Sequence, residues 1–166
     1  MPTFEHIRHK SPSELKEPRP LLVACAAMKS NVNVSTIVRT AGCCGVAEVV
    51  VTGNPKIDPK IARAGLDEVT ITAKRSLPPV LKRLKKEGYV LVGLEQTTNS
   101  TCLHDYSFPK KCVIVIGSER EGLSQDALDQ LDAVVEIPVW GMPHSYNVAT
   151  ATSMCLYEYC RQHPEG

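Results

Sequence analysis

The chain has 166 residues, 43% hydrophobic and 22% charged, with a formal net charge of +1 at pH 7. This length and composition suit one soluble globular domain rather than two, and the longest apolar runs, Leu21 to Met28 and Cys112 to Ile116, are far too short to cross a membrane. The net charge lacks the strong basic excess typical of nucleic-acid-binding domains, so evidence for such a partner must come from how the charges are distributed.

The first twenty residues predict an arm, and residues 21–166 predict the domain. The segment from Met1 to Pro20 is polar, charged and spaced by prolines, and it lacks the apolar stretch of a secretory signal. We therefore expect a cytoplasmic protein.

Short apolar runs rich in valine and isoleucine alternate with helical patterns along the rest of the chain. Five runs predict buried strands: Leu21 to Met28, Val46 to Thr52, Tyr89 to Leu94, Cys112 to Gly117 and Ala133 to Ile137. Residues 70–73 could form a further short strand within a stretch, 53–75, that otherwise predicts little. Runs that are apolar on both faces indicate a parallel sheet covered on both sides.

Helical periodicity and capping residues predict helices between these runs. They cover Ser35 to Cys44, Pro78 to Glu87, Ser124 to Leu131 and Asn147 to Gln162. Ser35 and Ser124 suit N-caps, and Gly45 and Gly88 suit helix ends. The last helix carries one largely apolar stripe, made of Val148, Thr152, Cys155, Leu156 and Tyr159. Strands and helices in alternation predict a layered α/β fold.

The seven cysteines predict free buried thiols. Their number is odd and several lie inside apolar segments, which argues against a disulfide framework. The chain has no CxxC pair and no Cys/His spacing typical of zinc. We therefore expect no metal site.

A polar segment from Asn33 to Thr40 lies where a predicted strand leads into a helix, with Arg39 about one turn inside. A capped helix N-terminus binds anions readily, and an arginine beside it fits a phosphate or a carboxylate. An ordinary capped helix with one charged side chain explains the segment equally well, so both interpretations stay open.

A second segment begins where a buried strand ends at Gly117 and leads into a polar loop with Glu119 and Gly122. Ligands of open α/β sheets bind outside the carboxyl ends of the strands, where Glu119 would lie. A loop that needs two residues with positive φ is the alternative. The spacing matches neither a Walker loop nor the GxGxxG pattern, so it favours neither ATP nor NAD.

A third segment, residues 137–149, combines a strand end, a long loop with two prolines and a Ser-Tyr-Asn triplet that opens a helix. The apolar Trp140 and Met142 in this loop, beside free backbone groups, could hold a flat adenine. A rigid loop followed by a helix that the serine or the asparagine caps is the alternative.

Together, these segments resemble the three sequence motifs of the SpoU/TrmH family of SPOUT RNA 2′-O-ribose methyltransferases, over about residues 20–162. In the first motif Asn33 and Arg39 match, whereas Ser35 stands where glycine is usual. The later matches are Gly117-Ser118-Glu119, Gly122-Leu123, Ile137-Pro138, Gly141 and Ser145-Tyr146-Asn147-Val148, with Tyr146 in place of leucine. The stretch from Gly93 to Thr97 also resembles the family's sequence before the second motif.

The resemblance implies a Rossmann-like parallel α/β sheet with a deep C-terminal trefoil knot, the SPOUT fold. It also implies a homodimer with active sites at the interface, to which the last helix contributes. The implied cofactor is S-adenosylmethionine, with S-adenosylhomocysteine as the product. The implied cofactor-binding residues are Leu94, Glu95, Gly117, Ser118, Ile137, Gly141, Met142, Tyr146 and Asn147. Backbone groups around five of these residues would hold the adenine: Leu94, Gly117, Ile137, Met142 and Tyr146.

The implied catalytic residues are Arg39, Asn33, Glu119, Ser145 and Asn147. Because the methyl group on a sulfonium is already activated, the enzyme must align the ribose 2′-hydroxyl and help to remove its proton. A guanidinium resists deprotonation and is a poor base, so we expect Arg39 to hold the 3′ phosphate of the RNA. The other four residues would orient the ribose and the methionine part of the cofactor. His144 is left outside this set because no acid or nucleophile accompanies it.

The expected RNA partner is a tRNA, or otherwise an rRNA. The stretch from Glu95 to Thr98 resembles the branch of the family that modifies the tRNA D-loop, which implies a D-loop guanosine as the target. Two groups of basic residues could contact it, one on a predicted helix and one in the arm: Lys82, Arg83, Lys85 and Lys86, and His6, Arg8, His9, Lys10 and Arg19. Two alternatives stay open. One is a catalytically inactive RNA-binding dimer of the same fold, supported by Ser35 and Tyr146, and the other is a generic nucleotide-binding α/β enzyme.

Overall fold

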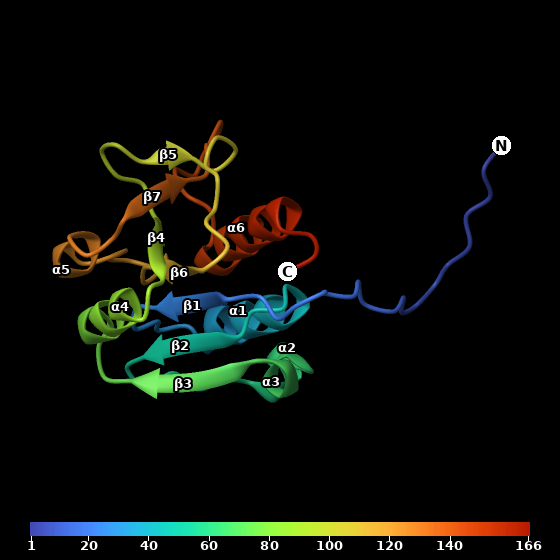
Figure 1. Cartoon of the computed structure of the whole chain (residues 1–166), viewed down its shortest axis with the longest axis horizontal. Coiled ribbons are helices and arrows are strands. Elements are labelled where there is room, and N and C mark those ends of the chain that lie inside the picture. The colour runs from blue at the N-terminus through green and yellow to red at the C-terminus, as the bar shows by residue number, and fades with distance from the viewer.

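Seven strands form a single sheet in the computed structural model, which describes all 166 residues. They are β1 (Leu21–Cys25), β2 (Glu48–Thr52), β3 (Thr70–Lys74), β4 (Val90–Leu94), β5 (Thr101–Cys102), β6 (Cys112–Ile116) and β7 (Ala133–Glu136). Their order is β3-β2-β1-β6-β4-β7-β5, and every neighbouring pair is parallel. The predicted parallel α/β sheet is confirmed, and because every pair is parallel the strands share one carboxyl edge; β1, β2 and β3 point the same way in Figure 1.

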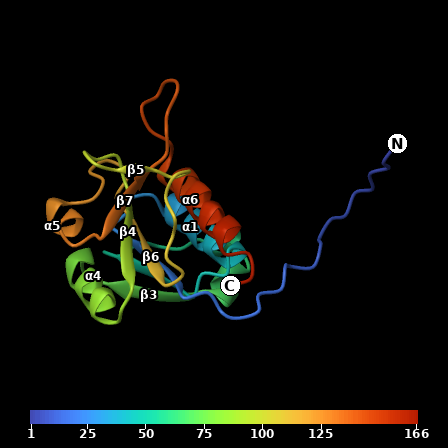
Figure 2. The same cartoon turned by 45° about the horizontal axis from the view of Figure 1, so that its top comes forward.

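Helices cover both faces of the sheet. They are α1 (Asn31–Cys43), α2 (Pro59–Ala62), α3 (Gly65–Glu68), α4 (Leu77–Lys86), α5 (Gln125–Leu128) and α6 (Val148–Gln162). On one face, α1 and α6 lie side by side (Figure 2) and share a large apolar cluster. On the other face, α4 and α5 pack over a smaller one. Because the sheet is covered twice, every residue of the central strands β1 and β6 is buried.

Helix α1 begins earlier than predicted because Ser30, and not Ser35, is its N-cap. The Oγ of Ser30 accepts a hydrogen bond from Asn33 N at 3.2 Å. Ser35 is fully buried inside the helix, where its Oγ donates to Asn31 O at 2.5 Å and accepts from Asp58 N at 2.8 Å. The N-cap prediction for Ser35 is therefore wrong, since the polar first turn of α1 has no apolar periodicity to reveal it. The Ser35 hydroxyl instead ties α1 to the segment before α2.

The other predicted helix ends agree more closely with the structure. Ser124 caps α5 and Asn147 caps α6 through side-chain hydrogen bonds to backbone amides. Gly45 and Gly88 follow α1 and α4 with φ angles of +66° and +84°, the left-handed conformation that ends helices. Helix α5 is shorter than predicted and ends at Leu128.

The stretch from 53 to 75 contains β3, which confirms the strand expected over 70–73, and also the one-turn helices α2 and α3. Those helices, like the two-residue strand β5, are too short to produce a periodic pattern, and the sequence did not predict them. The predicted stripe of α6 is buried except for Val148, which is half-buried. No helix of the structure has the length and apolar character needed to span a membrane.

All seven cysteines are free thiols, as predicted, and Cys25, Cys44, Cys112 and Cys155 are buried. Burial raises the pKa of Cys25 and of Cys112 to about 12, so both stay protonated at neutral pH. Cys43 departs from the prediction because it is exposed at the end of α1.

Most of the arm runs away from the domain (Figures 1 and 2), but Arg19 anchors its C-terminal end to the domain. This side chain is 7% exposed and donates from one terminal nitrogen to Cys44 O at 3.0 Å and from the other to His163 O at 2.6 Å. Those carbonyls lie just beyond the C-terminal ends of α1 and α6, where a cation is favoured. The prediction that Arg19 is available to RNA is therefore wrong, since the guanidinium joins the ends of the two helices.

We expect Arg19→Met to lower the free energy of unfolding by about 3 kcal/mol, because it removes two charged hydrogen bonds, one of them to the buried Cys44 carbonyl. Urea denaturation followed by circular dichroism measures the change. Lys16→Met is the matched control, since Lys16 forms only an exposed ion pair with Glu165, at 2.7 Å, and its loss should cost less than about 1 kcal/mol. Equal midpoints for the two variants would contradict the role of Arg19.

Candidate functional site

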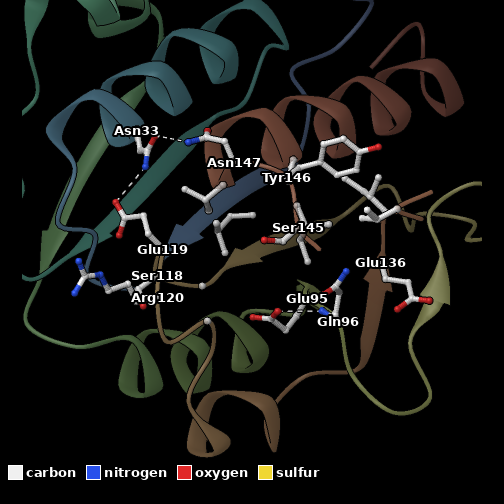
Figure 3. Close-up of a pocket in the computed structure, with 18 of the residues that line it drawn as sticks. Asn33, Glu95, Gln96, Ser118, Glu119, Arg120, Glu136, Ser145, Tyr146 and Asn147 are labelled. Atoms are coloured by element: carbon white, nitrogen blue, oxygen red, sulfur yellow. Dashed lines mark hydrogen bonds between the residues drawn. The ribbon is translucent and has the colours of Figure 1, made fainter. Parts of the chain in front are cut away.

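A cavity of about 600 Å³ lies at the carboxyl edge of the sheet. It opens beyond the ends of β4, β6 and β7, next to the N-terminal ends of α1 and α6 (Figure 3). In parallel α/β sheets, ligands bind at this edge because side chains and free amides from several loops meet there. All three sequence segments singled out above contribute to its wall.

Most of the predicted site residues line this cavity. They are Asn33, Leu94, Glu95, Gly117, Ser118, Glu119, Ile137, Ser145, Tyr146 and Asn147. Arg39, Gly141 and Met142 are not among the residues that line it. The structure therefore brings together residues from β4, β6, β7 and the two helix starts, as expected, and leaves out one residue of α1 and the tip of the loop before α6.

The tip of that loop does not form the expected adenine-binding cup. The loop extends away from the sheet (Figure 2), where Trp140 is 83% exposed and Met142 is 77% exposed. A side chain added at Gly141 would meet nothing within 4 Å. Gly141 and Met142 therefore lie outside the cavity wall in this structure, and their assignment to the cofactor site stays a prediction.

Arg39 lies outside the cavity of its own chain. It is exposed and makes no hydrogen bond or ion pair within the chain. Asn33 and Arg39 are six residues apart on α1, and at 3.6 residues per turn their side chains leave the helix about 120° apart. Because Asn33 faces the cavity, Arg39 points out of it.

Three predicted residues form a continuous hydrogen-bonded chain across the site (Figure 3). Glu119 accepts from Asn33 Nδ2 at 3.2 Å, and Asn33 Oδ1 accepts from Asn147 Nδ2 at 3.1 Å. Asn147 Oδ1 in turn accepts from two amides of the first turn of α6, at 3.0 and 3.2 Å. The chain links the loop after β6 to the starts of α1 and α6, and so fixes the relative positions of the three segments.

Glu119 is a carboxylate held by backbone amides. It accepts from Ser30 N at 2.9 Å and from Lys29 N at 3.1 Å, in addition to the bond from Asn33. Burial alone would raise the pKa of Glu119, but these hydrogen bonds outweigh that effect and hold the pKa below its usual value. Glu119 is therefore ionised at neutral pH and gives the cavity a fixed negative charge.

The loop after β6 is closed by a short backbone bridge. Ser118 N donates to Gly122 O at 3.1 Å, and Gly122 N donates to Ser118 O at 3.2 Å. Gly122 has a φ of +63°, so one residue of this segment, and not the two that the loop interpretation expected, has a positive φ. A Cβ at Gly117 would lie 2.5 Å from the Gly122 carbonyl carbon, so only glycine fits there. Glu95 supports the loop by accepting from Leu123 N at 3.1 Å.

Several lining residues were not predicted as site residues, among them Gln96, Arg120 and Glu136. Gln96 Nε2 donates to His144 O at 3.2 Å, and Glu136 accepts from Ser100 Oγ at 2.8 Å. The position of these polar residues at strand ends could have identified them from the sequence, since Gln96 lies just after the end of β4, Glu136 is the last residue of β7, and Arg120 follows Glu119. His144, which was left outside the catalytic set, does not line the cavity. No group of three or more His, Cys, Asp or Glu residues is arranged to hold a metal ion.

Known proteins share both the sequence pattern and the fold of this chain. Residues 20–157 match the family model described as the SpoU rRNA Methylase family. The chain is 32% identical over 133 residues to the tRNA (guanosine(18)-2′-O)-methyltransferase of Escherichia coli K12, an alignment that covers 78% of this chain and 58% of that protein. The chain also matches proteins of mouse and yeast that are named tRNA (guanosine(18)-2′-O)-methyltransferases, but it spans only 9% and 7% of their lengths.

Two solved structures extend the likeness to the fold. The A. aeolicus TrmH/SpoU tRNA modifying enzyme superposes with a TM-score of 0.84 at 29% identity, covering 91% of this chain and 79% of that one. The SpoU methyltransferase AviRb from Streptomyces viridochromogenes, solved in complex with AdoMet, superposes with a TM-score of 0.75 at 26% identity, covering 93% and 62%. This chain is therefore similar throughout the sheet and its helices to proteins of one kind.

Proposed function

This chain belongs to the SpoU rRNA methylase family, and on that premise we propose that it transfers a methyl group from S-adenosylmethionine to a ribose 2′-hydroxyl of structured RNA. The observation that carries the proposal is the cavity in which three separate sequence segments meet through Glu119, Asn33 and Asn147. The relatives named as RNA 2′-O-methyltransferases support the same reaction.

The cavity suits this cofactor in size and in chemistry. Its volume of about 600 Å³ lies within the usual range for pockets that hold small molecules. Leu94 and Ile137 supply apolar surface for the adenine, and Gly117 lets a ligand approach the backbone closely. The ionised Glu119 suits the positively charged methionine part. When bound, the cofactor supplies a methyl group activated by its sulfonium, and AviRb was solved with AdoMet.

The chain's own residues would position the RNA hydroxyl. Ser145 and Asn147 line the cavity opposite the loop after β6, where they can orient a ribose. Glu119 already accepts three hydrogen bonds, so its role is to hold Asn33 and the cofactor rather than to remove a proton. We assign to Arg39 the 3′ phosphate of the target nucleotide, as the poor basicity of a guanidinium requires.

We further propose that the active form is a homodimer in which Arg39 serves the cavity of the partner subunit. Arg39 points out of its own cavity, so a second copy is needed to bring a guanidinium to the site. Apolar side chains are exposed on the two helices that pack side by side: Val32 on α1 is 58% exposed, and Met154 and Tyr157 on α6 are 37% and 73% exposed. Exposed apolar side chains on neighbouring helices support an interface between subunits there.

The proposal includes a deep trefoil knot in the C-terminal part of the chain. Its support is the order of the sheet, in which β4 lies between two strands that follow it in sequence, β6 and β7. After β7 the chain returns to the centre of the molecule, where α6 packs on α1. The similarity to the A. aeolicus enzyme over 91% of the chain supports the same path.

We propose a tRNA substrate, with a D-loop guanosine as the first candidate and an rRNA as the alternative. The E. coli relative is named for guanosine 18 of tRNA. Of the four basic residues on α4, Lys85 pairs with Asp132 at 2.7 Å and Arg83 with Glu87 at 3.5 Å. This leaves Lys82 and Lys86 as unpaired cations on that helix. The cytoplasmic location stays a prediction from the sequence.

The inactive alternative has little to support it. Ser35 is accommodated by two hydrogen bonds inside the fold, and Tyr146 lines the cavity rather than filling it. Neither departure from the family pattern therefore blocks the site.

The test is incubation of the purified protein with total RNA and methyl-labelled S-adenosylmethionine, followed by size separation and nucleoside analysis. We expect label in the tRNA fraction as a 2′-O-methyl nucleoside. Label in rRNA alone would show that the substrate is an rRNA and not a tRNA. Measurable cofactor binding without label in any RNA would favour the inactive alternative, and label on a base would overturn the reaction itself.

A further inference from the structure

Two exposed cationic residues lie next to Glu119, and one of them, Arg120, lines the cavity. Arg120 follows Glu119 in the loop after β6 and lines the cavity. Lys29 lies in the loop between β1 and α1, and its backbone amide is 3.1 Å from the Glu119 carboxylate. Because β1 and β6 are neighbours in the sheet, the two loops lie next to each other. Lys29, through its backbone amide, and Arg120, as the next residue in the chain, are therefore both neighbours of Glu119 on adjacent loops.

These two side chains have no partner within the chain. Neither the Lys29 ammonium nor the Arg120 guanidinium forms a hydrogen bond or an ion pair, and Glu121 in the same loop does not pair with Arg120. The carboxylates nearby are already engaged: Glu119 accepts from the two backbone amides just before α1, and Glu95 accepts from the amides of Gln96 and Leu123. Arg120 is also the only cation that lines the cavity.

The loop that carries Arg120 is rigid. The two backbone hydrogen bonds between Ser118 and Gly122 close it, and Glu95 anchors its end. The side chain of Arg120 lies at the edge of the cavity, and its guanidinium is directed outward, away from Ser145 and Glu95 (Figure 3). A cation on a fixed loop at the cavity opening is placed to contact a macromolecule that binds over the opening, rather than a small ligand bound inside.

From this arrangement we propose that Arg120, assisted by Lys29, is a positioning residue that holds a backbone phosphate of the RNA on the chain's own side of the cavity. The inference rests on the proposed function, because the RNA is its substrate. A guanidinium binds a phosphate through two parallel hydrogen bonds, which fixes direction as well as distance. Arg39 of the partner subunit and Arg120 of this chain would then grip the target strand from two sides.

The test compares Arg120→Gln, Arg120→Lys and the double variant Lys29→Gln/Arg120→Gln with the wild type. Arg75→Gln is the matched control, since Arg75 follows the edge strand β3, is exposed, and does not line the cavity. The probes are an unmodified tRNA transcript and S-adenosylhomocysteine. Steady-state methylation, calorimetric binding of S-adenosylhomocysteine, and tRNA binding at several salt concentrations are measured on each protein, and thermal unfolding confirms that each is folded.

For Arg120→Gln we expect kcat/KM for the tRNA to fall about tenfold or more, mainly through KM, with unchanged affinity for S-adenosylhomocysteine. The slope of log affinity against log salt should become shallower by about 0.7 to 0.9, the loss of one phosphate contact. The double variant should lose more of the slope, and Arg120→Lys should restore part of the affinity because it keeps the charge.

Three results would overturn the inference. A matching loss of S-adenosylhomocysteine affinity would mean that Arg120 holds the cofactor's carboxylate. An unchanged salt slope would show that it contacts no phosphate, and an equal effect of Arg75→Gln would show only a general electrostatic field. The salt slope is measured without turnover, so it tests the phosphate contact of Arg120 even if the wild type methylates no RNA. A wild type that methylates no RNA would instead count against the proposed function.

Discussion

Arg39→Ala is expected to reduce methyl transfer by at least about a hundredfold while leaving the affinity for S-adenosylhomocysteine nearly unchanged. The reason is that Arg39 lies outside the cavity of its own chain and would contact only the RNA phosphate, so its removal should not change the affinity for the cofactor. Single-turnover methylation of an unmodified tRNA transcript and calorimetry with S-adenosylhomocysteine measure the two quantities. Loss of both together would refute the assignment of Arg39 to the RNA.

A mixed dimer tests whether Arg39 crosses the interface. One subunit carries Arg39→Ala and the other Asn147→Ala, which removes the link between Asn33 and α6. If Arg39 serves the partner's cavity, one of the two sites in this dimer has both residues intact, and activity should return to a substantial fraction of the wild-type value. If Arg39 acts within its own chain, both sites are defective and the mixture stays inactive. Each variant alone provides the background.

The parallel sheet and the meeting of the three segments could be predicted from the sequence because both follow from local rules. Runs apolar on both faces predict buried parallel strands, and parallel strands end at one edge. Glu119 and Asn147 were placed next to such ends or helix starts, and they do meet there through Asn33. Short elements such as α2 and β5 left no periodic trace and were missed.

The position of Arg39 could not be predicted, because the expected helix began at Ser35 and left Asn33 outside it. Once α1 is known to begin at Asn31, both residues lie on one helix and their directions follow from its pitch. The exposure of the apolar loop tip could not be predicted for a different reason. The side chains of Trp140 and Met142 suggest a packed surface, but the sequence does not say what they would pack against, and in this structure they face solvent.

Gly117→Ala is expected to abolish detectable binding of S-adenosylhomocysteine and with it all methylation. A methyl group at this position would lie 2.5 Å from the Gly122 carbonyl carbon and 2.8 Å from Leu123 N. Both are backbone atoms held by the Ser118–Gly122 bridge, so they cannot move aside without opening the loop. Opening the loop displaces Ser118 and Glu119 from the cavity wall together. Calorimetry with S-adenosylhomocysteine measures the result.

Gly88→Ala provides the matched control. Gly88 has a φ of +84° at the end of α4, so alanine there is also strained, at a cost of about 1 kcal/mol, but it lies outside the cavity. We expect both variants to unfold at lower urea concentration than the wild type, and only Gly117→Ala to lose the ligand. If the two glycine variants bound S-adenosylhomocysteine equally well, the loop after β6 could not be the wall of the cofactor site. If both lost binding in proportion to stability, the effect would be one of folding, and the cavity would need a second test with Glu119→Gln, which keeps the loop backbone and removes only the charge.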